Sequence, residues 1–257
     1  MNKLQRYFIQ SQENWQGSHV KIDGDDVHHI SRVMRNKPGD KLICNDMNGH
    51  AALCTITEIA NDQVLAVVEE WLEQETELPI EVTIVQGLPK GDKLDLIVQK
   101  GTELGATTFI PFRAERSIVN WDEKKKHKKI QRLEKIVKEA SEQSHRRRMP
   151  TVQAPVSLNE LLKLSLDYDY NIFAYEEEAR TRSFQSLANI LKEVKAGKRL
   201  LICIGPEGGF TEKEVKILKE NHFTPVRFGP RILRTETAAL YALSSISYHF
   251  EELRWQK

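Results

Sequence analysis

The sequence predicts an α/β protein with two domains, and three observations lead to this prediction. Residues 1–72 are rich in short strand-like runs separated by turn signals. The acidic stretch from Trp71 to Pro79 then interrupts this pattern, as a linker would. After Pro79, apolar runs of strand length alternate with helical stretches, which is the pattern of a mainly parallel sheet covered by helices. We therefore expect a small β-barrel in residues 1–72 and an α/β domain in residues 73–257.

The expected barrel consists of four strands and one helix. Asn48 and Gly49 separate two apolar runs and favour a hairpin turn. Asp25 can cap a helix that reaches Arg35, because apolar residues recur on one face of this segment. The strand-like runs are RYFI (6–9), KLICND (41–46), AALCTITEI (51–59) and QVLAVVEEW (63–71).

The expected α/β domain contains five alternations of strand and helix. Each strand is a short run rich in β-branched or aromatic residues, and each helix has the spacing of an amphipathic segment. The strands are expected at 80–87, 107–112, 170–176, 199–205 and 224–229, and the helices at 94–105, 125–143, 183–194, 211–220 and 236–250.

Composition excludes several classes of protein. Hydrophobic residues make up 40% and charged residues 29%, as in an ordinary globular protein. The longest apolar runs are far too short to span a bilayer, and the first ten residues lack the features of a signal peptide. We therefore expect a cytoplasmic protein with no membrane partner. Cys44, Cys54 and Cys203 stand in apolar runs without paired spacing, and no histidine spacing indicates zinc, so we expect no metal site.

The charges are distributed unevenly although the net charge is only +1. Residues 123–148 hold eleven Lys or Arg against four Glu, and residues 69–81 hold six Glu and no basic residue. Such a basic block is typical of a surface that meets nucleic acid, but equally of a solvated helix face. Charge alone leaves both interpretations open.

Two glycine-proline loops follow expected strands of the second domain. Gly205–Phe210 (GPEGGF) comes directly after one strand, and Gly229–Ala238 (GPRILRTETA) comes after the next. Ligands of α/β folds bind beyond the carboxyl ends of the strands, and glycines let the backbone approach a ligand closely. A tight strand-to-helix turn without a ligand is the alternative for one glycine pair. Two such loops at neighbouring strand ends favour a binding site.

Neither loop matches a phosphate-binding motif. The chain has no G-x-x-x-x-G-K-[ST] and no G-x-G-x-x-G sequence, which argues against ATP and NAD. A glycine-rich loop without these motifs suits a nucleoside that lacks phosphates, and S-adenosylmethionine is such a ligand.

These loops and four other segments resemble one family, the SPOUT methyltransferases that methylate N3 of a uridine in 16S ribosomal RNA. The signature pair is GPEGGF and, after a further strand, RILRTETA; here the second block reads FGPRILRTETAAL (228–240), with Phe228 and Pro230 as small departures. The other segments are RYFI, LPKGDKLDLIVQKGTELGA (88–106), PFRAERS (111–117) and EQSHRRRMP (142–150). The resemblance covers nearly the whole chain, in order.

The resemblance implies a fold, a partner and a reaction. The second domain would be a trefoil-knotted SPOUT domain, and the first a PUA-like barrel that helps to hold RNA. The protein would be a homodimer with the cofactor pocket near the subunit interface. S-adenosylmethionine would be the cofactor, and the substrate a specific uridine of 16S ribosomal RNA (position 1498 in the usual numbering) on the small ribosomal subunit. The implied cofactor contacts are Tyr175, Ile204, Gly205, Pro206, Glu207, Gly208, Gly209, Phe228, Gly229, Ile232, Leu233, Arg234, Thr237 and Ala238.

Methylation of uridine at N3 requires loss of the N3 proton. Arg234 is the candidate to stabilise the anionic uracil, since arginine is not deprotonated in proteins. Phosphate binding or a structural ion pair is the alternative role for this side chain. Glu236 is the second catalytic candidate; it or Glu207 could act as an acid or base, and each could instead cap a helix.

RNA contacts are expected from basic side chains to phosphates, and the target uridine must be unpaired because N3 lies on its pairing edge. Arg116, Gln143, Ser144 and Arg146 stand in segments that resemble the family. The full set of candidates is Arg6, Arg32, Arg35, Lys90, Lys93, Arg113, Arg116, Gln143, Ser144, Arg146 and Arg147.

Three other functions compete with this one. A non-catalytic RNA-binding protein would not need intact GPEGGF and RILRTETA loops. An α/β enzyme acting on a small nucleotide would need neither the basic helix nor the barrel. A SPOUT-type RNA 2′-O-ribose methyltransferase differs in its product, so nucleoside analysis would separate the two.

Overall fold

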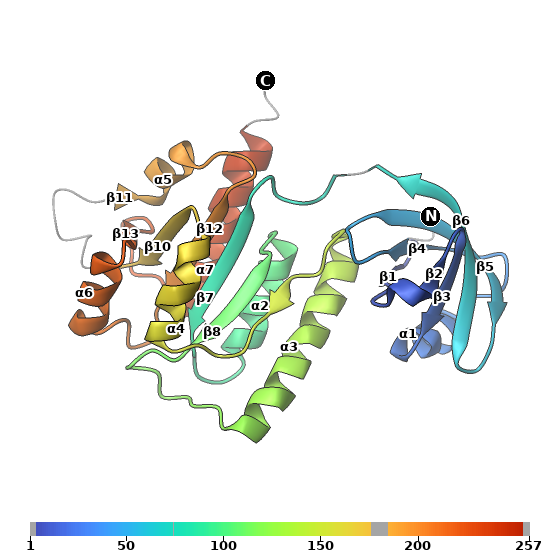
Figure 1. The fold of residues 1–257 in the computed structure, drawn as a ribbon, viewed down its shortest axis with the longest axis horizontal. Helices are drawn as coiled ribbons and strands as arrows, with labels where there is room; N and C mark the ends of the chain where they lie inside the picture. The colour runs from blue at the N-terminus through green and yellow to red at the C-terminus, as the bar shows by residue number, and fades with distance from the viewer. Residues whose placement is uncertain (1–3, 74, 176–184, 254–257) are drawn as a thin grey trace. The chain divides into compact units, whose positions relative to one another are not determined.

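The chain folds into two compact units, shown in a computed structural model that describes residues 4–73, 75–175 and 185–253 (Figure 1). Unit 1 comprises residues 1–77 and 141–148, and unit 2 comprises residues 78–140 and 149–257. The contacts within unit 1 thus extend past the expected boundary at residue 72 and include a segment of the basic block. No helix in the described ranges combines the length and apolar character needed to cross a membrane.

Unit 1 contains a six-stranded sheet with the strand order β1-β4-β5-β6-β3-β2. All neighbours are antiparallel except β1 and β4, which are parallel. The four expected strands and the hairpin turn at Asn48 and Gly49 are present, and β2 and β3 are additional. The elements are β1 (Arg6–Phe8), η1 (Gln12–Asn14), β2 (Trp15–Gln16), β3 (His19–Asp23), α1 (Asp25–His28), η2 (His29–Val33), β4 (Lys41–Asn45), β5 (Ala51–Ile59) and β6 (Gln63–Leu72).

The core of unit 1 lies on one face of this sheet. Alternate residues such as Val64 and Ala66 of β6 point into it, together with Cys44 and Cys54, which are free and buried. The pairing of β5 with β6 shifts register twice. Because β-bulges bend a strand and increase its twist, these irregularities help the sheet to curl over its core.

Unit 2 is built on a seven-stranded sheet in which every neighbouring pair is parallel. The strand order is β11-β13-β10-β12-β7-β8-β9. The mainly parallel sheet expected from the alternating pattern is confirmed. The strands are β7 (Glu81–Gly87), β8 (Thr108–Phe112), β9 (Thr151–Val152), β10 (Tyr170–Ala174), β11 (Gln185–Ser186), β12 (Arg199–Ile204) and β13 (Thr224–Arg227).

Helices cover both faces of this sheet. In β12, Leu200 and Ile202 pack toward the core that includes α2, α5 and α7, whereas Leu201 and Cys203 pack toward α4 and α6. Burial on both faces explains why these strands read as continuous apolar runs. The helices are α2 (Lys93–Glu103), α3 (Glu123–Gln143), α4 (Leu158–Leu164), η3 (Ser165–Asp167), α5 (Leu187–Glu193), α6 (Glu212–Glu220), α7 (Thr235–Ser247) and η5 (Tyr248–Glu252).

The structure adds β9, β11 and α4 to the expected elements of unit 2. Helix α4 begins at a capping box, in which Ser157 and Glu160 satisfy each other's backbone N–H groups. The helix expected at 183–194 is α5, and the expected start at Ser183 lies outside the described residues.

Candidate functional site

A cavity of about 510 Å³ lies at the carboxyl ends of three adjacent strands of unit 2, β13, β10 and β12. This is the edge at which α/β sheets bind ligands, and the volume suits a small molecule of nucleoside size. Its lining comes from the two glycine-proline loops and their flanks: Lys93, Arg116, Ala174, Tyr175, Ile204, Gly205, Pro206, Glu207, Gly208, Gly209, Phe210, Val226, Arg227, Phe228, Gly229, Pro230, Arg231, Ile232, Leu233, Arg234, Thr235 and Ala238.

The loop after β12 requires glycine for steric reasons. The Gly209 N–H donates to the Pro206 carbonyl at 2.8 Å, and Gly209 has a φ of 67°, in the left-handed region. Gly87, at the end of β7, lies under this turn: a Cβ there would come within 2.5 Å of Pro206 Cδ and 2.8 Å of the Gly205 carbonyl carbon. The loop therefore packs directly against the backbone of the neighbouring strand.

Thr235 ties the loop after β12 to α7. Its hydroxyl donates to the Gly205 carbonyl at 2.6 Å and accepts from the Gln86 side-chain amide at 2.7 Å. Gln86 also donates to the Gly87 carbonyl at 3.1 Å. Sequence reasoning missed both residues as parts of the site. The available signal for Gln86 was a polar side chain near the end of an otherwise apolar strand.

Lys93 forms an ionic bridge at the rim of the cavity. Its ammonium lies 2.8 Å from Glu207 and 3.4 Å from Glu236. The hydrogen bond to Glu207 raises the pKa of Lys93. Burial alone would raise the pKa of Glu207, but hydrogen bonds from Lys93 and from the Lys90 N–H hold that pKa below its usual range. Lys93 is therefore cationic and Glu207 anionic at neutral pH.

The arginines at the cavity differ in their partners. Arg116 donates to the Gly208 carbonyl at 2.9 Å, and a Cβ on Gly208 would lie 3.1 Å from the Arg116 Cβ, so this side chain supports the loop. Arg231 and Arg234 also line the cavity, and neither guanidinium has an ionic or hydrogen-bonding partner within the described parts of the chain. Arg234 precedes the first residue of α7.

The structure brings the predicted cofactor residues together with one exception. Thirteen of the fourteen line the cavity, whereas Thr237 is exposed on α7 and lies outside the lining. Glu236 is also outside the lining and contacts it through Lys93. The residues that sequence reasoning missed flank the predicted ones in the two loops and strand ends: Ala174, Phe210, Val226, Arg227, Pro230, Arg231 and Thr235.

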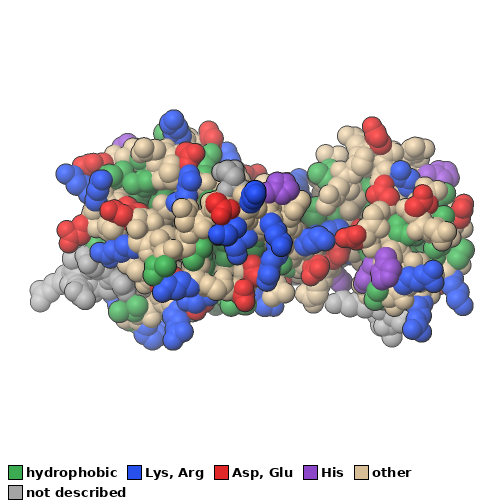
Figure 2. Space-filling model, turned by 90° about the horizontal axis from the view of Figure 1, so that it is seen from below, with side chains coloured by type: hydrophobic (Ala, Val, Ile, Leu, Met, Phe, Trp, Pro, Cys, Tyr) green, Lys and Arg blue, Asp and Glu red, His purple; other side chains and the backbone are tan. Residues whose placement is uncertain are grey.

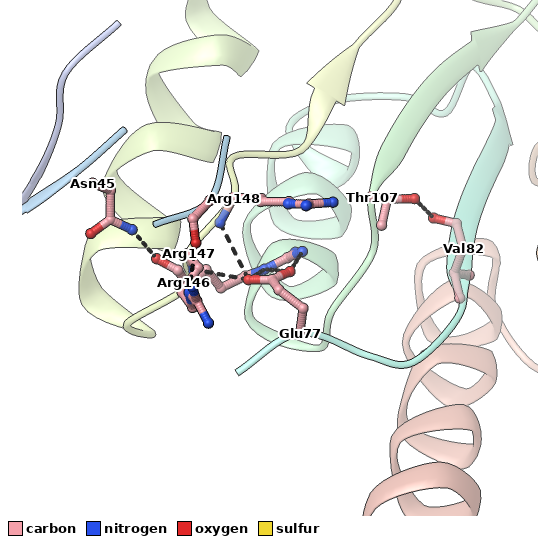
Figure 3. Close-up of polar contacts among 8 residues, drawn as sticks. Asn45, Glu77, Val82, Thr107, Arg146, Arg147 and Arg148 are labelled. Carbon is pink, nitrogen blue, oxygen red and sulfur yellow. Dashed lines mark hydrogen bonds and ion pairs between the residues drawn. The ribbon is translucent and has the colours of Figure 1, made fainter. Parts of the chain in front are cut away.

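Two predicted RNA contacts are buried within unit 1. The Arg6 and Arg146 residues are only 5% and 3% exposed. Arg6 donates to the Asn45 side chain at 3.0 Å, Asn45 donates to the Arg146 carbonyl at 2.9 Å, and the Arg146 guanidinium pairs with Glu77 (Figure 3). These positions differ from the surface location that a phosphate contact requires, and they indicate a structural role.

The other RNA candidates lie at the rim of the cavity or at exposed and half-buried positions of the two units. Lys93 and Arg116 belong to the rim of the cavity. Arg113 is exposed and lies 3.2 Å from Glu160, and Ser144 is half-buried. Arg32, Arg35, Lys90 and Gln143 are exposed, and Arg147 is half-buried in unit 1. On the face shown in Figure 2, basic side chains are interspersed with acidic ones and form no continuous patch.

Within the described residues, no cluster of three His, Cys, Asp or Glu side chains could hold a metal ion. The expected absence of a metal stays a prediction.

Known proteins match both units of the chain. The RNA methyltransferase domain family matches residues 76–247, and the RNA methyltransferase PUA domain family matches residues 22–69. The ribosomal RNA small subunit methyltransferase E of Bacillus subtilis is 48% identical over 98% of this chain and 99% of its own length.

Two solved structures resemble the whole chain. A ribosomal RNA small subunit methyltransferase E from Neisseria gonorrhoeae, bound to S-adenosylmethionine, is 29% identical with a TM-score of 0.81, over 95% of this chain and 97% of its own. A methyltransferase from Legionella pneumophila, in complex with the same cofactor, is 26% identical with a TM-score of 0.82 over the same shares. The fold, the cavity and these matches agree, and the chain belongs to the RNA methyltransferase family that includes the ribosomal RNA small subunit methyltransferases E.

Proposed function

We propose that this chain transfers the methyl group of S-adenosylmethionine to N3 of a uridine in the 16S ribosomal RNA of the small subunit, in the cytoplasm. The cavity between the two glycine-proline loops carries the proposal, because it stands where the family motifs predict the cofactor site. The proposal also takes the chain path to be the trefoil knot of SPOUT proteins. The strand order β13-β10-β12, with the last strand on the far side of β10 from β12, is compatible with that path.

The residues around the cavity fit the chemical parts of S-adenosylmethionine. Apolar walls suit an adenine ring, and they come from Ile204, Val226, Phe228, Leu233 and Ala238. Backbone groups of the two loops can pair with the polar edges of adenine and ribose. The Lys93 bridge and the guanidinium group of Arg231 offer charged partners for the amino-acid part of the cofactor. When bound, the cofactor supplies an electrophilic methyl group on its sulfonium.

The chain's own residues would position and charge-stabilise the acceptor. Arg234 lies at the cavity without a partner among the described residues, so its guanidinium can hydrogen-bond a uracil oxygen as N3 loses its proton. Glu236 lies 3.4 Å from the Lys93 ammonium at the rim of the cavity, and its carboxylate could accept or relay the proton. Exclusion of water by the apolar walls would strengthen both interactions.

Contacts with RNA would come from exposed cations of both units. Arg32 and Arg35 of unit 1 and Lys90 of unit 2 are exposed and have no ionic partner within the described residues. Arg113 and Arg147 already pair with glutamates, and phosphates would have to compete for them. Such contacts predict an affinity for RNA that falls with salt.

We also propose that the protein acts as a homodimer. Exposed apolar side chains gather beside the cavity and along α7 and η5, namely Ile232, Tyr241 and Tyr248. A second copy covering them would shield the cavity from water. Sedimentation at several concentrations tests this; a monomer at concentrations that support full activity would refute it.

The reaction is tested by methyl transfer from labelled S-adenosylmethionine to small ribosomal subunits that lack the modification, followed by digestion to nucleosides. Label in N3-methyluridine is the expected result. Label in a 2′-O-methylated nucleoside would replace the proposed product by the ribose product. No incorporation into subunits or into naked 16S RNA, with cofactor binding intact, would leave a non-catalytic RNA-binding function.

A further inference from the structure

Three aromatic side chains, Trp15, Trp71 and His50, form an aromatic group at one end of the core of unit 1. The Trp71 ring stacks on the Trp15 ring, with a centroid separation of 5.5 Å and an interplanar angle of 22°. His50 meets Trp71 edge-on, at 6.1 Å and 86°. Trp15 is packed against the core, whereas Trp71 remains 49% exposed. One side of the Trp71 ring is therefore covered by Trp15, and much of the remainder faces solvent.

A β-bulge accounts for the direction of Trp71. In β6, Val64, Ala66 and Val68 point toward the core, so simple alternation would direct residue 71 away from it. The register shifts between Leu53 and Cys54, and beyond the shift Trp71 pairs with Ala52, a fully buried core residue. Directly opposite residues share a face of the sheet, so Trp71 lies on the core side. The Trp71 side chain covers that side of the sheet, and part of its flat ring stays open to solvent.

The turn that carries His50 is held in one conformation. Asp46 accepts hydrogen bonds from the N–H groups of Asn48 at 2.8 Å and His50 at 2.7 Å, and its second carboxylate oxygen lies 2.8 Å from the His50 ring. The imidazole is thereby fixed against Trp71. A rigid aromatic surface loses little conformational entropy when a flat ligand binds.

Two arginines lie against the same turn. Arg147 Nε donates to the Gly49 carbonyl at 2.6 Å, and Arg148 Nη2 donates to the Asn48 carbonyl at 3.3 Å. A Cβ on Gly49 would come within 2.7 Å of Arg148 Nε, so the Arg148 side chain crosses the turn at its glycine.

Glu77 fixes the backbone of these arginines. It accepts from the N–H groups of Arg147 at 2.9 Å and Arg148 at 3.3 Å (Figure 3). Glu75 lies 3.8 Å from Arg147 and is 75% exposed in its side chain, so a phosphate could displace it. The aromatic group and the two cations therefore share one turn of unit 1, at residues 48–50.

We propose that Trp71 is a stacking platform for an unpaired base of RNA, and that Arg147 and Arg148 pair with the phosphates beside that base. This inference deepens the proposed function and rests on it, since it names how unit 1 holds the RNA substrate. Bases of any sequence stack on an exposed indole, and cations beside it bind the backbone. The structural alternative is that Trp71 only covers Trp15.

The test compares two variants that both keep an apolar cover over Trp15. Trp71→Phe retains an aromatic face, and Trp71→Leu does not. The probe is a short single-stranded RNA of mixed sequence, with the same RNA annealed to its complement as a control. We expect Trp71→Leu to weaken binding of the single strand by about tenfold, and Trp71→Phe by about threefold or less. Binding of the duplex and of S-adenosylmethionine should be unchanged in both.

Arg148→Gln gives a second measurement that does not depend on the aromatic core. It should reduce the salt dependence of single-strand binding by about one phosphate contact. Thermal denaturation of all three variants checks that unit 1 remains folded. An unchanged salt dependence in this variant would overturn the assignment of Arg148.

The outcomes separate this proposal from the proposed function. Equal affinities of the leucine and phenylalanine variants, or no binding of single-stranded RNA by the wild-type chain, would overturn the platform. If Trp71→Leu kept its affinity for RNA but no longer methylated ribosomal subunits, that result would also overturn the platform and would point to a contact with protein. A third outcome combines two results: Trp71→Leu binds single-stranded RNA more weakly than the wild-type chain, and the wild-type chain transfers no methyl group. This outcome would support the platform and refute the proposed function.

Discussion

Replacing Thr235 by valine should lower the affinity for the cofactor, the free energy of unfolding or both, because the threonine hydroxyl joins α7 to the loop after β12. The residue is 7% exposed, and valine reproduces its shape without its hydrogen bonds. The substitution removes the donor to the Gly205 carbonyl and the acceptor of one Gln86 hydrogen bond. Gln86 keeps its bond to the Gly87 carbonyl, so the Gly205 carbonyl suffers the larger loss.

Gly205 is half-buried and lines the cavity, so the cost of a fully buried carbonyl sets the upper limit of the expected effect. A buried polar group left unpaired costs about 1–3 kcal/mol. If the loop stays in place, this cost reduces the free energy of unfolding. If the loop shifts until water reaches Gly205, stability is kept and the cofactor must restore the loop when it binds. The loss of unfolding free energy and the loss of binding free energy should therefore sum to about 1–3 kcal/mol, and the binding share can reach roughly 150-fold in affinity.

Titration calorimetry with S-adenosylmethionine and urea denaturation measure the two shares. Thr235→Ser is the matched control, because it keeps the hydroxyl and removes only a methyl group. A valine variant with wild-type cofactor affinity and wild-type unfolding free energy would refute the reasoning. A serine variant that loses as much as the valine variant would show that the methyl group matters, and not the hydroxyl.

Three further substitutions test other parts of the chain. Arg234→Ala should reduce turnover by about 10²- to 10³-fold and leave cofactor affinity unchanged, if its guanidinium stabilises the uracil anion; steady-state kinetics with parallel calorimetry measures this. Gly87→Ala should weaken cofactor binding on the order of tenfold or more by calorimetry, because its Cβ would lie 2.5 Å from Pro206. Glu77→Gln should lower the free energy of unfolding by about 3 kcal/mol, since it removes the carboxylate charge that pairs with the buried Arg146 guanidinium. Burial alone would raise the pKa of Glu77, but hydrogen bonds from Arg146 hold that pKa below 4.5. The free energy of unfolding of the wild-type chain should therefore fall as the pH drops below about 4.5. The variant should lose part of this pH dependence, as measured by urea titrations.

Each of these predictions has a result that contradicts it. Near-normal turnover of Arg234→Ala would remove the proposed role of the guanidinium, and Arg234→Lys should recover part of the activity if charge is what matters. Wild-type cofactor affinity in Gly87→Ala would show that the loop tolerates displacement. Glu75→Gln is the control for Glu77→Gln, because Glu75 is exposed and weakly paired. Equal losses in these two variants would refute the role assigned to the buried pair.

The fold of unit 2 could be predicted because its signals are local. Continuous apolar runs predict strands that are buried on both faces, and each is separated from the next by an amphipathic helix or a turn signal. The hairpin at Asn48 and Gly49 was equally local. Strands β2, β9 and β11 escaped prediction because each is only two residues long, and β9 and β11 are also defined by pairing with distant strands, β8 and β13.

The candidate site was predictable for a different reason. Its loops follow parallel strands, and the carboxyl ends of such strands meet at one edge, so linear motifs become neighbours in space. Contacts that depend on packing between elements had no such signal. Gln86 and Thr235 are 149 residues apart in the chain, and their hydrogen bond exists because β7 and the start of α7 both meet the loop after β12.

The two blocks of charge in the sequence show why local charge alone does not separate structural arginines from exposed ones. Glu77 belongs to the acidic block and Arg146 to the basic one, and the folded chain pairs them within unit 1. Burying this pair costs desolvation, which is partly offset because Glu77 also accepts the backbone N–H groups of Arg147 and Arg148. The basic block thus contains an arginine that fixes the fold of residues 141–148 and, two positions later, Arg148, which is exposed. Arg146 and Arg148 differ in role because the Glu77 carboxylate, about seventy residues away in the chain, pairs with the Arg146 guanidinium. No count of charges in the segment could separate these two arginines.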